Sequence, residues 1–385
     1  MIEFLGLAVA ALALCIASIV SLELKVPPLI VFLLIGMVVG TLGYLQDNAS
    51  IAFIGGLGSV MLLFAIGTEF SIYKLFKTGF FKEIQAALIE LALSFIILYA
   101  VFSSWFGSST AMIIALAFSI TSTGISLKLL QELGLTKRFD IHLIVKISVI
   151  EDLITVLVFA IISSLSVSSG TPINAAVISF FISVLLFIIA YSMFSAFIDR
   201  FLFKFDIKEE DILMLALGTL LLFVSIASAL GLSASFGAYI AGSVVSVWKE
   251  KWGALENDMR KFSYIFISFF FLSVGLQVSL ANVNVPLLLL ILAIVLIVKF
   301  AGLFVGTQIA FRSYRTAFFT SLGMLSRGEL SLVIVSAAVA SNLIPQSFLT
   351  ITALTVLFSV VISAILLRLS ADIYYLLRIK LPMHM

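Results

Sequence analysis

Long apolar runs separated by short polar connections fill this sequence from one end to the other. A bilayer core about 30 Å thick is crossed by about 20 residues of α-helix, and most of the runs have roughly this length. Backbone groups cannot stay unpaired in lipid, so each run is predicted to be helical. We therefore expect an all-α polytopic membrane protein with about thirteen transmembrane helices. The predicted spans lie near residues 4–22, 27–45, 50–68, 84–106, 108–130, 141–165, 173–197, 211–230, 232–248, 262–281, 285–311, 316–341 and 346–377.

Basic residues are distributed unevenly between the connections. All of the 22 lysines and arginines except Lys146, Lys299 and Arg327 lie in or beside the odd-numbered connections or in the C-terminal tail. Even-numbered connections, such as residues 103–107 and 341–345, carry none. Positive charge marks the cytoplasmic side of a membrane protein. This pattern predicts a multi-pass protein of the cell membrane with its N-terminus outside and its C-terminus in the cytoplasm.

The composition agrees with the pattern of runs. Charged residues make up 11% of the chain, whereas soluble domains have about 25%. The net charge is only +2, so nucleic acid is not expected as a partner. The single cysteine, Cys15, has no partner for an intrachain disulfide. The first apolar run lacks a basic segment before it, which favours a first helix over a cleaved signal peptide.

Five charged residues lie deep inside predicted spans. Glu151 and Asp152 are about ten residues into their helix, which places them roughly 15 Å below its end. Lys299, Arg327 and Glu329 lie at comparable depth in two other spans. Each charge at the bilayer centre costs about 2.5–3.5 kcal/mol, so these residues are expected to pair or to face a water-filled cavity. Ion pairs that only hold helices together are the alternative interpretation.

The adjacent acids Glu151 and Asp152 are predicted to bind a cation or a proton. Neighbouring side chains point roughly 100° apart on a helix, so one partner cannot easily neutralise both. Two close carboxylates repel each other, which favours binding of a positive ligand. One site with two competing positive ligands is the chemistry that an antiporter needs. Lys299 is expected to pair with Glu151 or Asp152 and to be released when a cation binds, or to carry the proton itself.

Other polar residues inside spans have weaker assignments. Ser148 lies four residues before Asp152 on the same helix face, so its hydroxyl is a candidate cation ligand, although it could instead bond its own backbone. Glu69, at the cytoplasmic end of its span, either lines a funnel towards the site or is an interfacial acid. Lys146 is interpreted as a lysine that reaches the interface, and Glu90 as a structural acid.

Two spans are interrupted by polar residues and glycine, at residues 118–126 and 321–329. Paired discontinuous helices, one in each half of a transporter, are typical of an ion site at mid-membrane depth. The broken spans are the fifth and the twelfth, and this odd shift predicts two halves of inverted topology. Ordinary kinks at Gly124 and Gly328 are the alternative.

The two interruptions also supply candidate site residues. Thr121 and Thr123 in the first are expected to provide oxygens for the cation. Arg327 and Glu329 in the second are expected to neutralise the dipole ends of half-helices where the interruptions meet.

Several motifs follow one another in a characteristic order. They are Leu63–Glu69, Ser119–Leu130 with Thr121-Ser122-Thr123, Ile150-Glu151-Asp152, Gly231–Gly242, Phe269–Leu276, Lys299 and Ser326–Leu330. With these motifs the chain resembles the monovalent cation:proton antiporter superfamily, in its second branch of the Kef and NapA type. The resemblance covers essentially the whole chain.

The resemblance implies a homodimer in which each protomer has a scaffold domain and a mobile six-helix core that moves like an elevator. It also implies that Asp152 is the principal carrier of cation and proton. Related proteins have Asp, Asn or Gln at the position of Glu151, and an acid there together with Lys299 resembles the electrogenic members. Kef-type members usually continue into a soluble nucleotide-binding domain. Residues 1–385 are expected to form a single exchanger membrane domain without such a regulatory domain.

The sequence therefore predicts secondary active antiport of Na⁺ or K⁺ against protons, with no enzymatic activity and no cofactor. A uniporter or channel-like carrier for another small solute on the same fold is the alternative, and a non-transporting sensor is a more distant one. An intramembrane enzyme is disfavoured because Glu151 and Asp152 are adjacent, unlike the separated aspartates of an aspartyl protease. The two histidines, His142 and His384, lie near an interface and in the tail.

Overall fold

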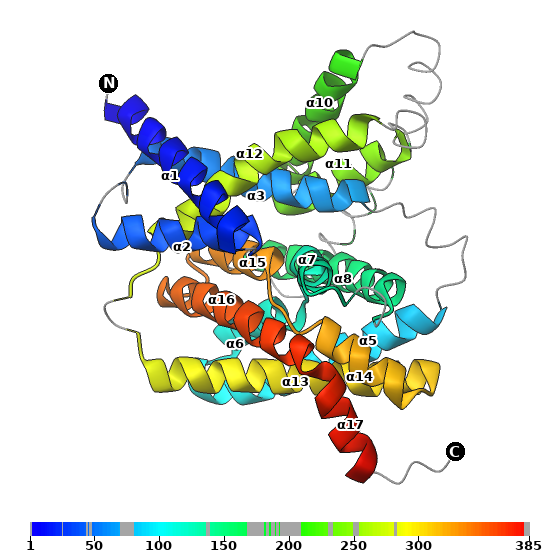
Figure 1. Ribbon diagram of the computed structural model, residues 1–385. Coiled ribbons are helices and arrows are strands. Elements are labelled where there is room, and N and C mark those ends of the chain that lie inside the picture. Colours follow the sequence, from blue (N-terminus) through cyan, green and yellow to red (C-terminus); the bar gives the residue numbers. More distant parts are fainter. Residues whose placement is uncertain are drawn as a thin grey trace. The chain divides into compact units, whose positions relative to one another are not determined.

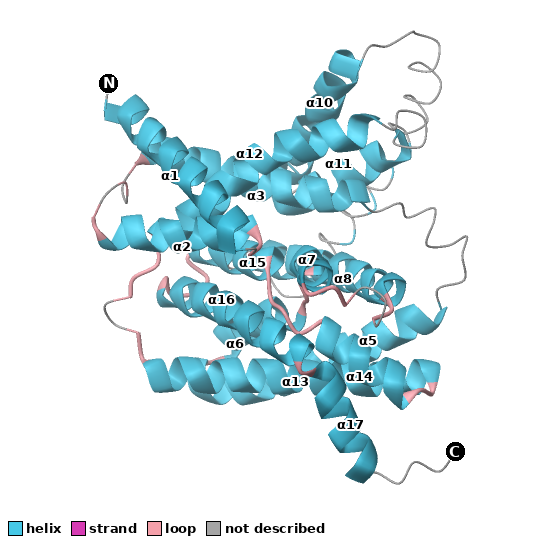
Figure 2. Ribbon diagram, viewed as in Figure 1, coloured by secondary structure: helices cyan, strands magenta, loops and turns pink. Residues whose placement is uncertain are grey.

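The computed structural model describes most of the chain, and all regular structure in the described part is helical (Figure 2). The described residues are 2–24, 26–43, 45, 48–69, 81–135, 139–167, 181, 185, 189, 192, 209–229, 234–248, 254–280 and 283–380. The helices are α1 (Ile2–Leu24), α2 (Pro28–Thr41), α3 (Ala49–Glu69), α5 (Phe81–Phe106), α6 (Ser108–Ser119), α7 (Thr123–Glu132), α8 (Ile141–Val167), α10 (Glu209–Ala229), α11 (Ala234–Trp248), α12 (Ala254–Leu276), α13 (Val285–Phe311), α14 (Tyr314–Gly323), α15 (Glu329–Ala340), α16 (Ser347–Arg368) and α17 (Ser370–Lys380).

Predicted spans and described helices agree closely in position. Every predicted span coincides with one helix or with a pair of helices, except the span near 173–197, which lies almost entirely outside the described residues. Seven segments in the described part are long and apolar enough to cross a membrane. Four further apolar helices among the described residues are shorter, at Pro28–Thr41, Phe236–Ser246, Lys261–Leu276 and Glu329–Ala340. A multi-pass helical protein is thus confirmed, while the number thirteen and the inverted topology of the two halves stay predictions.

The last predicted span, 346–377, is wrong in its length. The long helix α16 ends at Arg368, and a separate helix α17 begins at Ser370. A cation in the last turn is favoured by the helix dipole, so Arg368 suits a helix end better than a helix interior. Helix α12 also differs from its prediction: it begins at Ala254, in a polar stretch, and ends at Leu276 instead of near residue 281.

The chain divides into two compact units. The first contains residues 1–14, 47–79 and 156–273, and the second contains residues 15–46, 80–155 and 274–385. In the first unit, Gly67 of α3 and Gly242 of α11 leave no space for a side chain between the two backbones. Small residues allow this close approach of membrane helices.

In the second unit, helices α5 and α13 lie side by side (Figure 1). A β-carbon on Gly302 of α13 would lie 2.8 Å from the Ser94 hydroxyl of α5. One on Gly306 would lie 2.5 Å from the carbonyl oxygen of Ala86, also on α5. Gly302 and Gly306 are four residues apart and face the same neighbour, as in other close contacts between membrane helices. We call this contact the α5–α13 seam. Lys299 precedes Gly302 by three residues and lies on the same face.

Both predicted interruptions are confirmed as breaks in helices. Helix α6 ends at Ser119, Ile120 is extended, and α7 begins at Thr123. Helix α14 ends at Gly323, and α15 begins at Glu329 after a non-helical segment. Since several residues leave the helical conformation in each case, the alternative of simple kinks does not describe these segments.

Candidate functional site

The two breaks lie against each other within the second unit. The backbone N–H of Ser122 donates a hydrogen bond to the carbonyl oxygen of Ser326 at 3.0 Å. The Thr121 hydroxyl donates to the carbonyl oxygen of Met324 at 3.1 Å, and the hydroxyls of Ser126 and Ser326 are 2.8 Å apart. Non-helical backbone inside a membrane needs partners of this kind. The breaks therefore satisfy part of each other's hydrogen-bonding requirement.

Gly328 makes this close approach possible. A β-carbon on Gly328 would overlap both the Cβ and the Oγ of Ser122. Gly124, the glycine of the first break, has more space: the nearest atom to a β-carbon added there would be Glu329 Oε1, at 3.8 Å. Each glycine thus interrupts a predicted span in the sequence, but only Gly328 lies where the structure has no space for a side chain.

Substituting alanine at these two glycines is expected to have different effects. Gly328→Ala should lower the midpoint of thermal unfolding in detergent, because overpacking of a filled site costs about 1–3 kcal/mol. Gly124→Ala is the matched control, and its midpoint should equal or exceed that of the wild type, because alanine favours helix over glycine by about 1 kcal/mol. Equal midpoints for the two variants would contradict the close contact at Gly328.

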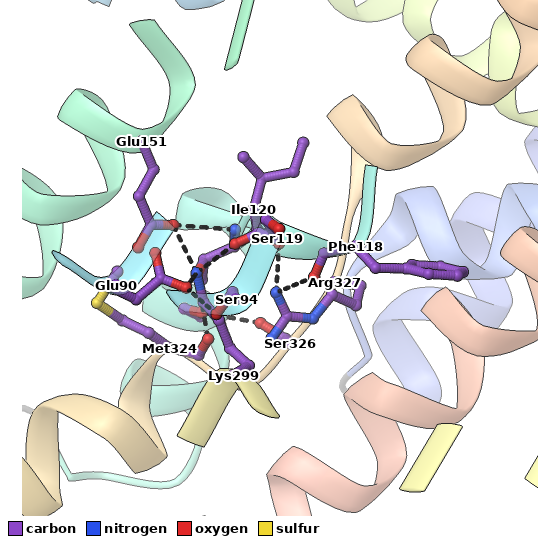
Figure 3. Close-up of polar contacts among 12 residues, drawn as sticks. Glu90, Ser94, Phe118, Ser119, Ile120, Glu151, Lys299, Met324, Ser326 and Arg327 are labelled. Atoms are coloured by element: carbon purple, nitrogen blue, oxygen red, sulfur yellow. Dashed lines mark hydrogen bonds and ion pairs between the residues drawn. The ribbon is translucent and has the colours of Figure 1, made fainter. Parts of the chain in front are cut away.

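Arg327 lies fully buried beside the first break (Figure 3). Its Nη1 donates to the carbonyl oxygens of Phe118, at 3.2 Å, and Ile120, at 2.5 Å. Its backbone N–H donates to the Ser359 hydroxyl of α16 at 2.9 Å. The last carbonyls of a helix have no partner within the helix and carry a partial negative charge. The guanidinium group thus lies at the end of α6, where the sequence analysis predicts a charge that neutralises the helix dipole.

Glu329 occupies the opposite kind of helix end. It is the first residue of α15, and its Oε2 accepts a hydrogen bond from the Ser122 hydroxyl at 2.7 Å. A carboxylate at a helix N-terminus faces the positive end of the helix dipole. The geometry therefore has the arrangement expected for Arg327 and Glu329, and their contribution to stability stays a prediction.

Lys299 lies between two carboxylates (Figure 3). Its Nζ is 2.8 Å from Glu90 Oε1 and 3.0 Å from Glu151 Oε2. It also donates to the carbonyl oxygen of Ser119, the last residue of α6, at 2.6 Å. All three side chains, Lys299, Glu90 and Glu151, are at most 1% exposed. An ammonium group has three donors, and these contacts account for all of them.

Glu151 also connects helix α8 to the first break. Its Oε2 accepts a hydrogen bond from the backbone N–H of Thr121 at 3.1 Å. Its other oxygen, Oε1, is buried without a hydrogen-bond partner among the described residues. Of the two pairings that the sequence allowed for Lys299, the structure contains the one with Glu151.

Asp152 follows Glu151 on α8 and is 7% exposed. Ser148, four residues before it, and Thr155, three residues after it, lie on the same face of the helix. The hydroxyls of Ser148, Thr155 and Thr123 are buried and have no hydrogen-bond partner in the described part of the chain. Buried polar atoms without partners call for an explanation, such as an ion or water that binds there. Thr155 is an oxygen donor that the sequence analysis did not single out.

Glu90 is the residue of this cluster that sequence reasoning missed. Interpreted as a structural acid, it instead pairs with Lys299, and its Oε1 also accepts a hydrogen bond from Ser94 at 2.8 Å. Its Oε2 is buried without a partner among the described residues. A signal was available in the sequence, since a glutamate and a serine four residues apart share one face of an otherwise apolar helix.

Two further candidates lie elsewhere. Lys146 is 39% exposed and forms an ion pair with Glu83 at 3.0 Å, in agreement with its interpretation as a lysine that reaches the interface. Glu69 is the last residue of α3, in the first unit, and its side chain lies outside the described part of the structure. A funnel at Glu69 stays a prediction.

Two broken membrane helices meet beside buried acids and a lysine. This arrangement is typical of an ion-coupled membrane transporter. Comparison with known proteins identifies the family. The chain belongs to the sodium/hydrogen exchanger family, because the family model described as "Sodium/hydrogen exchanger, transmembrane" matches residues 9–369. The predicted membership of the monovalent cation:proton antiporter superfamily is confirmed, and this is a family of transporters.

Relatives with named functions are similar along nearly their whole length. The chain is 29% identical to the Na(+)/H(+) antiporter of Enterococcus hirae, over 95% of this chain and 97% of that protein. It is 26% identical to the K(+)/H(+) antiporter subunit KhtU of Bacillus subtilis, over 96% of this chain and 93% of that protein. The sodium proton antiporter MjNhaP1 from Methanocaldococcus jannaschii has the same fold, with a TM-score of 0.69 and 18% identity over 96% of this chain and 99% of that one.

Proposed function

We propose that this protein is a secondary active antiporter that exchanges Na⁺ or K⁺ for protons across the cell membrane. The named functions of the relatives from Enterococcus hirae and Bacillus subtilis support this proposal. The observation that carries it is the ion pair between Lys299 and Glu151, directly beside Asp152 and against the break between α6 and α7.

In the proposed exchange, Asp152 binds either a proton or the cation. A cation that approaches Asp152 also meets Glu151, whose Oε1 has no hydrogen-bond partner among the described residues. Hydroxyl oxygens of Thr121, Thr123 and Ser148 would complete the coordination. Because a cation and the ammonium group of Lys299 repel each other, cation binding weakens the pair between Lys299 and Glu151.

Alternating access is proposed to follow the division of the chain into two units. Both broken helices and the charged cluster belong to the second unit, which is the candidate for the mobile core. The first unit is the candidate for the scaffold. An elevator-like movement, a homodimer, electrogenic exchange, and an N-terminus outside with the C-terminus in the cytoplasm complete this proposal.

Purified protein in lipid vesicles with a pH-sensitive dye inside would test the proposal. Addition of Na⁺ or K⁺ to vesicles with a preformed pH gradient should dissipate the gradient, and a membrane current should accompany the exchange if it is electrogenic. Each cation should be tested in turn against an impermeant control salt. Cation flux without coupled proton movement would instead support the uniporter or channel-like alternative.

A further inference from the structure

Lys299 has two carboxylate partners on two different helices, and the proposed exchange uses only one of them. Glu151 is on α8, beside Asp152, whereas Glu90 is on α5. The ammonium group is as close to Glu90, at 2.8 Å, as it is to Glu151, at 3.0 Å. Figure 3 shows Lys299 reaching towards both carboxylates. Glu90 is therefore a second carboxylate partner for Lys299, separate from the proposed cation site.

A cation at Glu151 creates an electrostatic problem for Lys299. The cation attracts the carboxylate that holds the ammonium group and repels the ammonium group itself. Lys299 is 1% exposed, so water cannot take the place of the lost carboxylate. An unpaired buried charge is strongly destabilising, which would oppose cation binding. A second carboxylate within contact distance removes this obstacle.

Glu90 is held in position to be that second partner. The α5–α13 seam places the backbones of α5 and α13 in contact at Gly302, three residues after Lys299. Gly302 faces both Glu90 and Ser94, and the Ser94 hydroxyl donates to the same Glu90 oxygen that binds Lys299. Glu151, in contrast, faces the non-helical segment at Thr121. Lys299 and Glu90 thus lie on two helices whose backbones are in contact, whereas Glu151 lies against a break between helices.

We propose that Glu90 is a positioning residue of the antiporter, which keeps the ammonium group of Lys299 paired while a cation occupies Glu151 and Asp152. Glu90 acts through Lys299 and does not bind the cation. This inference rests on the proposed exchange function and deepens it. Glu151 and Asp152 bind the cation, and Glu90 binds Lys299.

The test is the cation dependence of exchange in vesicles for Glu90→Gln, Lys299→Gln and the double variant. Glu90→Gln should raise the KM for the transported cation roughly tenfold or more, with a smaller effect on the maximal rate, since tenfold corresponds to about 1.4 kcal/mol. Adding Lys299→Gln should bring the KM back towards the wild-type value, because removal of both members of a buried pair is far less costly than removal of one. A purely structural role of Glu90 would not be reversed by the second substitution.

Glu83→Gln is the matched control. It makes the same substitution on the same helix, in a glutamate that pairs with a lysine at 3.0 Å but lies outside the cluster, and its KM should equal that of the wild type. A wild-type KM in Glu90→Gln, or no recovery in the double variant, would overturn the inference. If Glu90→Gln does not fold, Lys299→Gln is compared with the double variant. A higher KM in the double variant than in Lys299→Gln would show that Glu90 does not act through Lys299. Absence of exchange in the wild type would overturn the proposed function itself.

Discussion

Replacing Asp152 by asparagine is expected to abolish cation:proton exchange. The side chains have the same shape, so the buried position on α8 can still be filled. The amide carries no negative charge and cannot bind a proton under physiological conditions, so neither transported ion has its carrier. A cation that enters this buried site without a carboxylate to pair with is destabilised by about 3–5 kcal/mol. Exchange should therefore fall by roughly 100-fold or more, since each 1.4 kcal/mol is a factor of ten.

The measurement is the rate at which Na⁺ or K⁺ dissipates a pH gradient across vesicles that contain the variant. Asp258→Asn is the matched control, because it makes the same substitution at an exposed ion pair with Lys261, on α12. The control should retain the wild-type rate. Elution as a single species from a sizing column establishes that Asp152→Asn is folded. A folded Asp152→Asn protein with substantial exchange would refute the assignment of Asp152 as the carrier.

The helical framework was predictable because lipid imposes a simple rule on sequence. Apolar length sets the spans, and a polar interruption such as the one at Thr121 stands out against an apolar background. The position of Lys299 was equally visible, since a lysine so far inside a span has few alternatives to an ion pair. Ends of helices were less predictable: the predicted span 346–377 continues across the turn at Leu369, because the apolar residues 373–377 closely follow the polar residues Ser370 and Asp372.

The partners of the buried charges could not be read from the sequence alone. Depth along a helix is known from residue counting, but the direction in which a side chain points depends on which helices touch. Glu90 is nearer to the end of its span than Glu151 or Lys299 is to its own, so depth alone does not mark it as a site residue. The α5–α13 seam, formed by Gly302 and Gly306, brings it to Lys299. Glycines spaced four apart indicated a helix contact but not the identity of the helix in contact.

Removal of the Arg327 guanidinium is expected to lower the stability of the protein strongly. Arg327→Met keeps an apolar side chain of similar length but leaves the carbonyl oxygens of Phe118 and Ile120 without their donor, at the negative end of α6. A hydrogen bond to a charged group contributes about 1.5–3 kcal/mol, so loss of two should cost about 3 kcal/mol or more.

The fraction of protein that stays monodisperse in detergent after heating measures this effect. Arg327→Met should lose its monodisperse peak at a clearly lower temperature than the wild type. Arg327→Lys should fall between them, because lysine keeps the charge but its ammonium nitrogen lies one bond closer to the backbone than Nη1, the atom that contacts both carbonyls. Arg315→Met, at an exposed arginine in the first turn of α14, is the control and should behave as the wild type. If Arg327→Met and the wild type aggregate at the same temperature, the hydrogen bonds of the guanidinium group do not stabilise the first break.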